Sequence, residues 1–165
     1  MPSDADFDRV PVNTFTDNLC SPDVLSDLRF TGIKIAAPSK VALEGKPDAF
    51  GTFARVVVAG AYRLEANYLG LRERFMPRLV VVAVDLRSHR AYAGHVTGLF
   101  DAEPGADPYA NMLLTDADFQ GRFISEYFNT NLAQVLPLPQ IETEYAVYAA
   151  LGAYVSNVVQ IALVP

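Results

Sequence analysis

The sequence predicts a single all-β domain built as a two-sheet antiparallel sandwich of about seven strands. Tyr (8) and Phe (10) are plentiful among 165 residues, and aromatic and β-branched residues favour strands. Short apolar runs alternate with turn residues at the spacing of a sandwich. We find no helical stretch long enough for a βαβ crossover, which argues against a parallel sheet. Hydrophobic residues make up 51% of the chain and charged residues 19%, which is a globular composition.

Residues 1–26 are predicted to be an irregular N-terminal arm laid on a sandwich of residues 27–165. The arm is rich in Asp, Ser, Asn and Pro, with isolated apolar residues such as Phe7 and Val10. Ser21-Pro22-Asp23 has the pattern of a helix start, so we expect one or two helical turns through Leu28. Because the arm lies outside the sandwich pattern, its removal is expected to leave the pattern of the core intact.

The strands are marked by apolar runs that end at Gly, Pro, Asn or Asp. Leu79–Leu86 is the most hydrophobic run and is apolar on both faces, so we expect it at the centre of its sheet. Gly60 indicates a β-bulge. The expected strands cover residues 30–43 with a break at Pro38, 53–64, 79–86, 91–96, 122–136, 145–151 and 155–164.

A long loop is expected at residues 99–114, followed by a helical turn that Thr115 caps. The same Asp-Ala-Asp-Phe tetrapeptide occurs at 4–7 and 116–119, which is too short to indicate a repeat. The run from Tyr145 to Pro165 has no charged residue, and we interpret it as two strands rather than a membrane span.

Charge and cysteine content narrow the class of protein. A net charge of −6 and a pI of about 4.8 disfavour nucleic-acid binding. The only cysteine is Cys20, so no intrachain disulfide forms; this fits a reducing compartment, although many secreted bacterial domains also lack disulfides. The acidic N-terminus is not a signal peptide. We therefore expect a cytoplasmic protein if this N-terminus is native, and a secreted or periplasmic one if a signal peptide was removed.

The last third of the chain resembles the end of a known type of sandwich. This segment is similar to strands F and G of bacterial immunoglobulin-like and fibronectin type III-like domains. The similarity lies in Pro139, the strand that Tyr145 opens, the turn at Gly152 and the strand after Ser156. The resemblance implies an immunoglobulin-like fold in which the Tyr145 hydroxyl bonds back to the preceding loop. Thr143 stands where these domains often have Gly, and their paired cysteines are absent. The fold by itself implies no activity.

Two groups of residues are candidate binding sites. Asp101, Glu103 and Asp107, with Asp116 and Asp118 after them, are spaced as possible calcium ligands from a flexible loop. The aromatic side chains of Tyr92, Phe100 and Tyr109 are candidates for a ligand or protein contact.

Other candidate metal-binding or catalytic residues have less support from the sequence. His89 and His95 are expected at opposite ends of a strand and lack a third zinc ligand. Cys20 has no partner histidine nearby in sequence, and Glu142 and Glu144 are expected to be solvated. No catalytic residue is assigned.

The sequence thus favours a non-catalytic interaction module that binds a protein partner, or itself, through an edge strand or an aromatic face. A calcium-assisted carbohydrate-binding domain that uses loop 101–118 is the alternative, and a hydrolase is disfavoured. No cofactor is expected apart from calcium.

Overall fold

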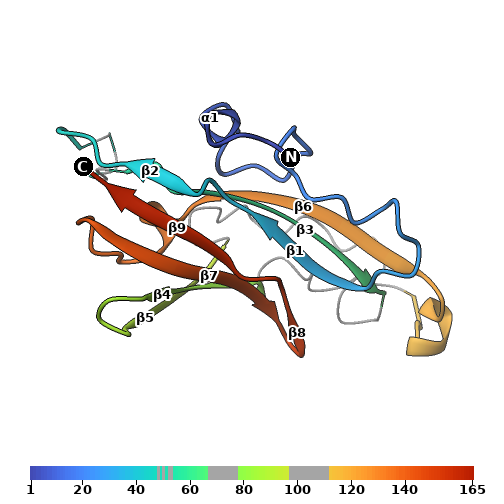
Figure 1. The fold of residues 1–165 in the computed structure, drawn as a ribbon. Helices are drawn as coiled ribbons and strands as arrows, with labels where there is room; N and C mark the ends of the chain where they lie inside the picture. The colour runs from blue at the N-terminus through green and yellow to red at the C-terminus, as the bar shows by residue number, and fades with distance from the viewer. Residues whose placement is uncertain (48, 50, 52–53, 67–77, 97–111) are drawn as a thin grey trace.

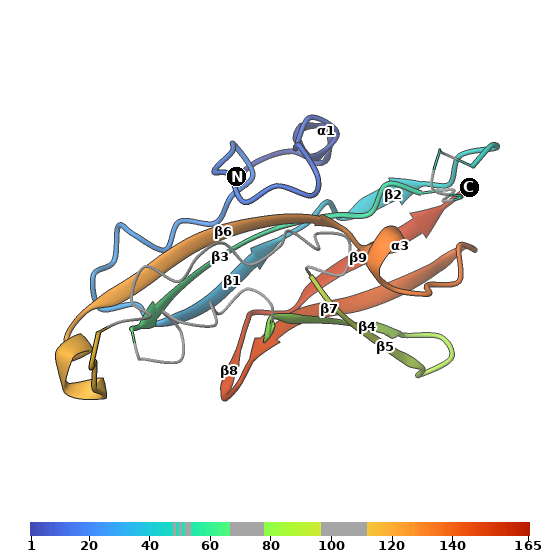
Figure 2. The same cartoon turned by 180° about the vertical axis from the view of Figure 1, so that it is seen from behind.

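The computed structural model describes residues 1–47, 49, 51, 54–66, 78–96 and 112–165, and the strands among them form two packed sheets (Figures 1 and 2). The all-β class is therefore confirmed. The small sheet has the order β1-β3-β6, and the large sheet has the order β2-β9-β7-β4-β5, with β8 paired to β7. The strands are β1 (Gly32–Ala36), β2 (Lys40–Ala42), β3 (Val57–Glu65), β4 (Val80–Asp85), β5 (Ala91–His95), β6 (Phe123–Asn131), β7 (Thr143–Leu151), β8 (Tyr154–Val155) and β9 (Val159–Val164).

One strand pair departs from the predicted antiparallel arrangement. β1 pairs antiparallel with β3 in the small sheet, whereas β2 pairs in parallel with β9 in the large sheet. The expected break at Pro38 lies between β1 and β2, where proline cannot donate to a ladder. The chain crosses from the small sheet to the large sheet at this break. β1 therefore belongs to the small sheet, and β2, which follows it directly, belongs to the large sheet.

The core lies between the inner faces of the two sheets. β7 alternates between buried and partly exposed residues along its length, as expected for a strand with one face on the core. β3 is different, because every residue from Val57 to Leu64 is buried. The bulge expected at Gly60 is absent: the register runs continuously through the Gly60–Phe128 pair. The glycine is instead required because a Cβ at this position would overlap the ring of Phe128.

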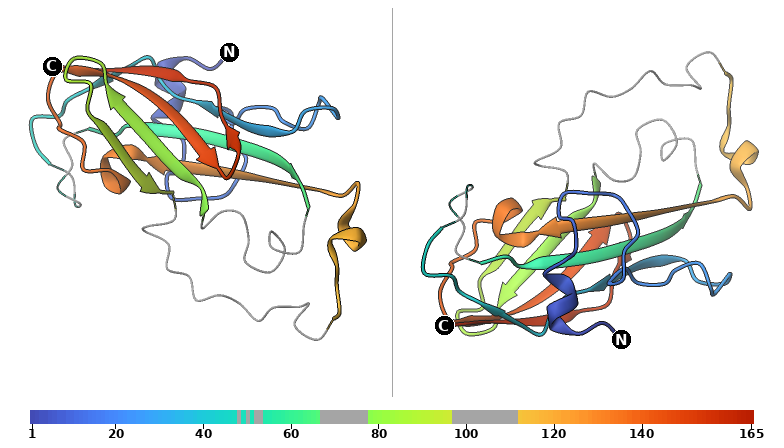
Figure 3. Two further views of the ribbon diagram at one scale, coloured as in Figure 1. Left: turned by 90° about the horizontal axis from the view of Figure 1, so that it is seen from below. Right: turned by 90° about the horizontal axis from the view of Figure 1, so that it is seen from above.

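The N-terminal arm covers the outer face of the small sheet (Figure 3, right). Phe7, Val10 and Cys20 form a second buried cluster with Val57 and Ala59 of β3. This explains why β3 is buried on both faces. The arm is thus a layer of the fold rather than a loose extension.

Polar contacts fix the arm at three points. The Arg55 guanidinium donates to the carbonyl of Phe7 at 2.8 Å and also to that of Val10. The Asp4 carboxylate accepts from the Ser39 hydroxyl at 2.7 Å and from the Ser39 backbone N–H at 2.8 Å, and these two bonds lower its pKa.

The third point is a bridge to the edge of β6. Thr14 and Asn129 form an isolated antiparallel bridge, and the Asn129 amide also donates to the carbonyl of Thr16 at 2.8 Å.

The helices differ in part from expectation. No helix begins at Ser21: the Asp23 carboxylate accepts from the N–H groups of Leu25 and Ser26, both at 2.9 Å, which closes a turn instead. A hydrogen bond from the Ser26 side chain, together with these two backbone bonds, lowers the pKa of Asp23 to about 2.

The two copies of Asp-Ala-Asp-Phe form equivalent single turns. They are α1 (Asp4–Phe7) and η2 (Asp116–Phe119), and each has a capping box, Ser3 with Asp6 and Thr115 with Asp118. The turn expected after Thr115 is therefore present. α3 (Leu132–Val135) replaces the predicted end of the β6 strand, and the Asn131 side chain caps it by accepting from the N–H of Ala133.

Tyr145 joins β7 to the segment that precedes it. Its ring is buried in the core, and its hydroxyl donates to the carbonyl of Pro139 at 2.9 Å. Burial, with the nearby Asp85 carboxylate second, raises the pKa of Tyr145 to about 12. The uncharged run that Tyr145 opens forms β7, β8 and β9, and no helix in the described part of the chain is long and apolar enough to cross a bilayer.

Replacing Tyr145 with Phe should lower the free energy of unfolding by about 1 kcal/mol, because the Pro139 carbonyl loses its donor. Urea denaturation measures this change. The matched control is Tyr148→Phe on the opposite face of β7, for which we expect a shift within about 0.5 kcal/mol. Equal midpoints for the wild type and Tyr145→Phe would show that the bond contributes nothing.

Replacing Phe7 with Ala should lower the free energy of unfolding by about 3–5 kcal/mol, because a buried ring leaves a cavity over β3. Leu19→Ala is the control in the same arm, since Leu19 is 78% exposed and should be nearly neutral. Thermal or urea unfolding gives both values. If Phe7→Ala were as mild as the control, the arm would not be part of the cooperative fold.

Candidate interaction surface

Most of the residues predicted for ligand binding cannot be placed. Phe100, Tyr109, Asp101, Glu103 and Asp107 lie outside the described residues. Tyr92 lies on β5 with its side chain against the core, where its ring contacts that of Tyr145 edge-on at 6.4 Å.

The other predicted groups are dispersed. His89 lies in the turn before β5 and His95 ends that strand, and both are exposed. Among the described residues no group of three potential ligands could hold a metal ion. Asp118 is engaged in capping, since its carboxylate accepts from the Thr115 N–H at 2.7 Å.

Cys20 is buried against β3, and the helix expected to begin beside it at Ser21 is not formed. Burial, followed by the negative charge of Asp6, raises the pKa of the Cys20 thiol. A raised pKa disfavours the thiolate that nucleophilic chemistry requires. The cysteine therefore acts as a small apolar residue under the arm.

A partly buried polar pair joins β3 and β6. Tyr62 and Glu126 are register partners on β3 and β6, and the Tyr62 hydroxyl donates to the Glu126 carboxylate. Burial raises the pKa of Glu126. The hydroxyl satisfies a carboxylate that the sandwich partly removes from water, so the pair has a structural explanation.

The outer face of the large sheet is unusual because it is apolar. In β4 the inward residues Val81 and Ala83 are fully buried, while Val80, Val82 and Val84 point the other way and are partly exposed. The outer faces of antiparallel sheets are normally polar. We call the following set the apolar face: Val80, Val82 and Val84 of β4, Ala91 and Ala93 of β5, and Ala146, Tyr148 and Ala150 of β7.

Strand register makes the apolar face continuous. Val82 lies opposite Ala93 on one side and Tyr148 on the other. Val84 likewise lies between Ala91 and Ala146. At strand spacings of about 4.8 Å and 3.4 Å per residue, the three strands present an apolar area on the order of 300 Å². Viewed from below, β4, β5 and β7 face the reader with no described helix or strand in front of them (Figure 3, left).

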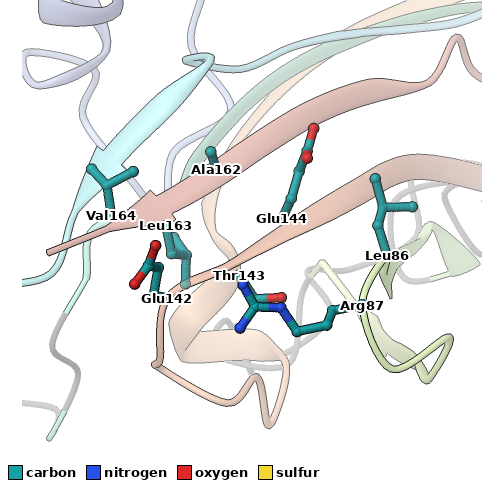
Figure 4. Close-up of a pocket in the computed structure, with 8 residues that line it drawn as sticks. All are labelled: Leu86, Arg87, Glu142, Thr143, Glu144, Ala162, Leu163 and Val164. Carbon is teal, nitrogen blue, oxygen red and sulfur yellow. The ribbon is translucent and has the colours of Figure 1, made fainter.

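Polar groups and a shallow pocket border the apolar face (Figure 4). The pocket has a volume of about 350 Å³ and lies where β4, β7 and β9 meet. Glu142, Glu144 and the Arg87 guanidinium contribute its charges, and Leu86, Ala162 and Val164 its apolar wall. Glu144 continues the outward row of β7 next to Ala146, so charge of both signs lies at the edge of the apolar face.

Sequence reasoning missed this surface, although the signal was present. The run Leu79–Leu86 is apolar on both faces, which predicts burial in the middle of a sheet. β4 does have a strand on each side, β7 and β5, but no described layer covers its outer face. β7 shows the same pattern, with apolar residues on its outer face at Ala146, Tyr148 and Ala150.

No protein-family model, curated protein or solved structure matches the chain.

Two isosteric substitutions on neighbouring residues test the exposure of the apolar face. Val81→Thr should lower the free energy of unfolding by about 1–3 kcal/mol, because it buries a hydroxyl in the core. Val82→Thr should change it by about 0.5 kcal/mol or less, because water reaches the outer face. Urea denaturation of both variants decides the matter. A Val82→Thr variant as unstable as Val81→Thr would mean that the face is covered.

Proposed function

We propose that this chain is an immunoglobulin-like, non-catalytic binding module that docks another protein on its apolar face. The strand arrangement supports the fold assignment. β1 and β2 divide one edge between two sheets, β2 runs parallel to the last strand, and the Tyr145 hydroxyl bonds to the segment before β7. These are features of immunoglobulin-like sandwiches.

The observation that carries the proposal is the contrast between the two outer faces. The small sheet also has an apolar outer face, with Val57 and Ala59, and the arm covers it. The large sheet has three valines and a tyrosine in the same situation, and no described segment covers them. Contiguous exposed apolar surface marks interaction sites in folded proteins.

The energetics fit an interface with an apolar centre and a polar rim. Burying about 300 Å² of apolar surface contributes roughly 7 kcal/mol at about 25 cal/mol/Å². Association itself costs about 4–15 kcal/mol, so the apolar face alone gives at most a weak complex. Glu144, Arg87 and His95 lie around it and supply groups for hydrogen bonds and ion pairs with a partner.

The alternative of calcium-assisted carbohydrate binding depends on Asp101, Glu103 and Asp107, with Phe100 and Tyr109. All five lie outside the described residues, so this alternative stays a prediction. Hydrolysis has no support in the site geometry, where Glu142 and Glu144 line an open pocket beside Arg87.

A photo-crosslinking experiment tests the proposed docking. A benzophenone amino acid at position 150, on the apolar face, should capture a defined partner in cells that express the protein. Val82→Glu should reduce that capture by about tenfold or more, because it places a charge in the centre of the interface without entering the core. Capture is measured by mass spectrometry of the crosslinked band.

Leu113→Glu is the matched control, since Leu113 is an apolar residue that is fully exposed elsewhere on the surface. It should leave capture unchanged. If Val82→Glu and Leu113→Glu gave the same crosslinked proteins as the wild type, the apolar face would not be the docking surface.

A further inference from the structure

The apolar face is about as wide as one α-helix. It spans the neighbouring strands β5, β4 and β7, and two strand spacings of about 4.8 Å make it about 10 Å wide. The step along β4 from Val80 to Val84 makes it about 14 Å long. Glu144 follows it on β7, and His95 lies beside Val80 at its other end. An α-helix with its side chains is about 10–12 Å across, and a length of about 14 Å corresponds to between two and three helical turns.

The area of the apolar face favours a single segment over a whole sheet as its occupant. A standard interface buries about 800 Å² on each partner, and more than half of that area is apolar. The apolar face offers only about 300 Å². A partner that packed a sheet of its own against it would also bring strands over the charged pocket at Glu142, Glu144 and Arg87. A single helix covers the apolar residues and stops short of these charges.

The centre of the apolar face offers an extended peptide no backbone groups to pair with. β4 has β5 and β7 as neighbours, and β7 has β4 and β9, so the ladders on both sides of each strand engage their N–H and C=O groups. A peptide that binds by strand addition needs a free sheet edge. On a sheet face, a segment must instead satisfy its own backbone groups, and an α-helix does so within one segment. A single segment on this face is therefore best accommodated as a helix.

The side chains of the apolar face leave room for a helix over β4 and β5. β4 contributes a row of three valines, and β5 beside it contributes only alanines. On the other side of the valine row, Tyr148 is the large side chain, and it lies between Ala146 and Ala150. Small side chains allow a helix to approach the sheet closely, and the Tyr148 ring gives it an aromatic contact at its side. Aromatic residues of this kind are enriched among those that dominate binding energy.

We propose that the occupant is an amphipathic α-helix of a partner protein, about three turns long, that lies along β4 with its apolar side on the valine row. This inference rests on the proposed docking at the apolar face and names the structure of the docked segment. Residues three, four and seven positions apart share one side of a helix, so three or four apolar residues at this spacing cover the row. The opposite side of the helix faces water and is polar.

The helices in the described part of the chain do not fit this place. α1, η2 and α3 have four residues each, which is little more than one turn. α1 lies in the arm over the small sheet, on the opposite side of the molecule from the apolar face (Figure 3). The helix therefore comes from a partner of different sequence, which brings a longer apolar stripe than these turns can offer.

Crosslinks from both ends of the apolar face measure the rise per residue of the bound segment. One variant carries a benzophenone amino acid at position 150 and another carries it at position 146, and tandem mass spectrometry identifies the captured residue of the partner. The two positions lie about 14 Å apart on the outer side of β7. A helix along the strand should give captured residues about nine positions apart, at about 1.5 Å per residue. An extended segment would give about four, at about 3.4 Å per residue.

The outcomes of this experiment separate the helix from the proposed docking. An offset of about nine positions within one segment supports both. An offset of about four, or captured residues in unconnected parts of the partner sequence, would overturn the helix and leave the docking intact. If neither position captured a partner, the docking itself would be wrong, and the helix with it.

A synthetic peptide with the sequence of the captured segment gives a second readout on the isolated protein. Proline in place of a central, outward-facing residue of the peptide should weaken binding by about tenfold or more, because proline disrupts a helix interior. Alanine at the same position is the control and should bind like the parent peptide. Val82→Glu in the protein should weaken binding of the parent peptide, and Leu113→Glu should not. Equal affinities of the proline and alanine peptides would overturn the helix.

Discussion

The structure depends on a constraint that both sheets share: an apolar sheet face must be covered. β3 meets this requirement twice, with the large sheet on its inner face and the N-terminal arm on its outer face. The arm is held at the Phe7 and Val10 carbonyls by Arg55, so its apolar residues stay in position over Val57 and Ala59. β4 meets the requirement only once. Its outer valines have no described layer over them, and we propose that a partner protein covers them.

The same logic extends from faces to edges. Asn157, the Thr14 bridge and Asp4 each satisfy backbone groups at an edge that would otherwise pair with a foreign strand. β5 lacks such a contact among the described residues, and it borders the apolar face. Among the described residues, the uncovered apolar surface and a row of unpartnered backbone groups therefore lie on the same side of the large sheet.

Much of the fold could be predicted from the sequence, because strand period and turn chemistry are local signals. The strands around Val82 and Tyr145 and the helical turn after Thr115 were correctly expected. The parallel pairing of β2 with β9 depends on a crossover at Pro38 that no local pattern reveals. Gly60 was misread as a bulge because its real cause, the ring of Phe128, lies 68 positions away on another strand (128 minus 60). The helix expected at Ser21 does not form, because the Asp23 carboxylate accepts from the N–H of Leu25 and closes a turn there.

The apolar face shows why a site can be visible in sequence and still be missed. A strand that is apolar on both sides predicts burial on both sides, and only the three-dimensional layers reveal which side has no cover. The most direct test is the effect of a soluble paramagnetic probe on the methyl NMR signals of the isolated protein. We predict strong broadening for Val80, Val82 and Val84, and protection for Val57, Ala59 and Val81. A Val82 methyl signal as protected as that of Val81 would contradict the account.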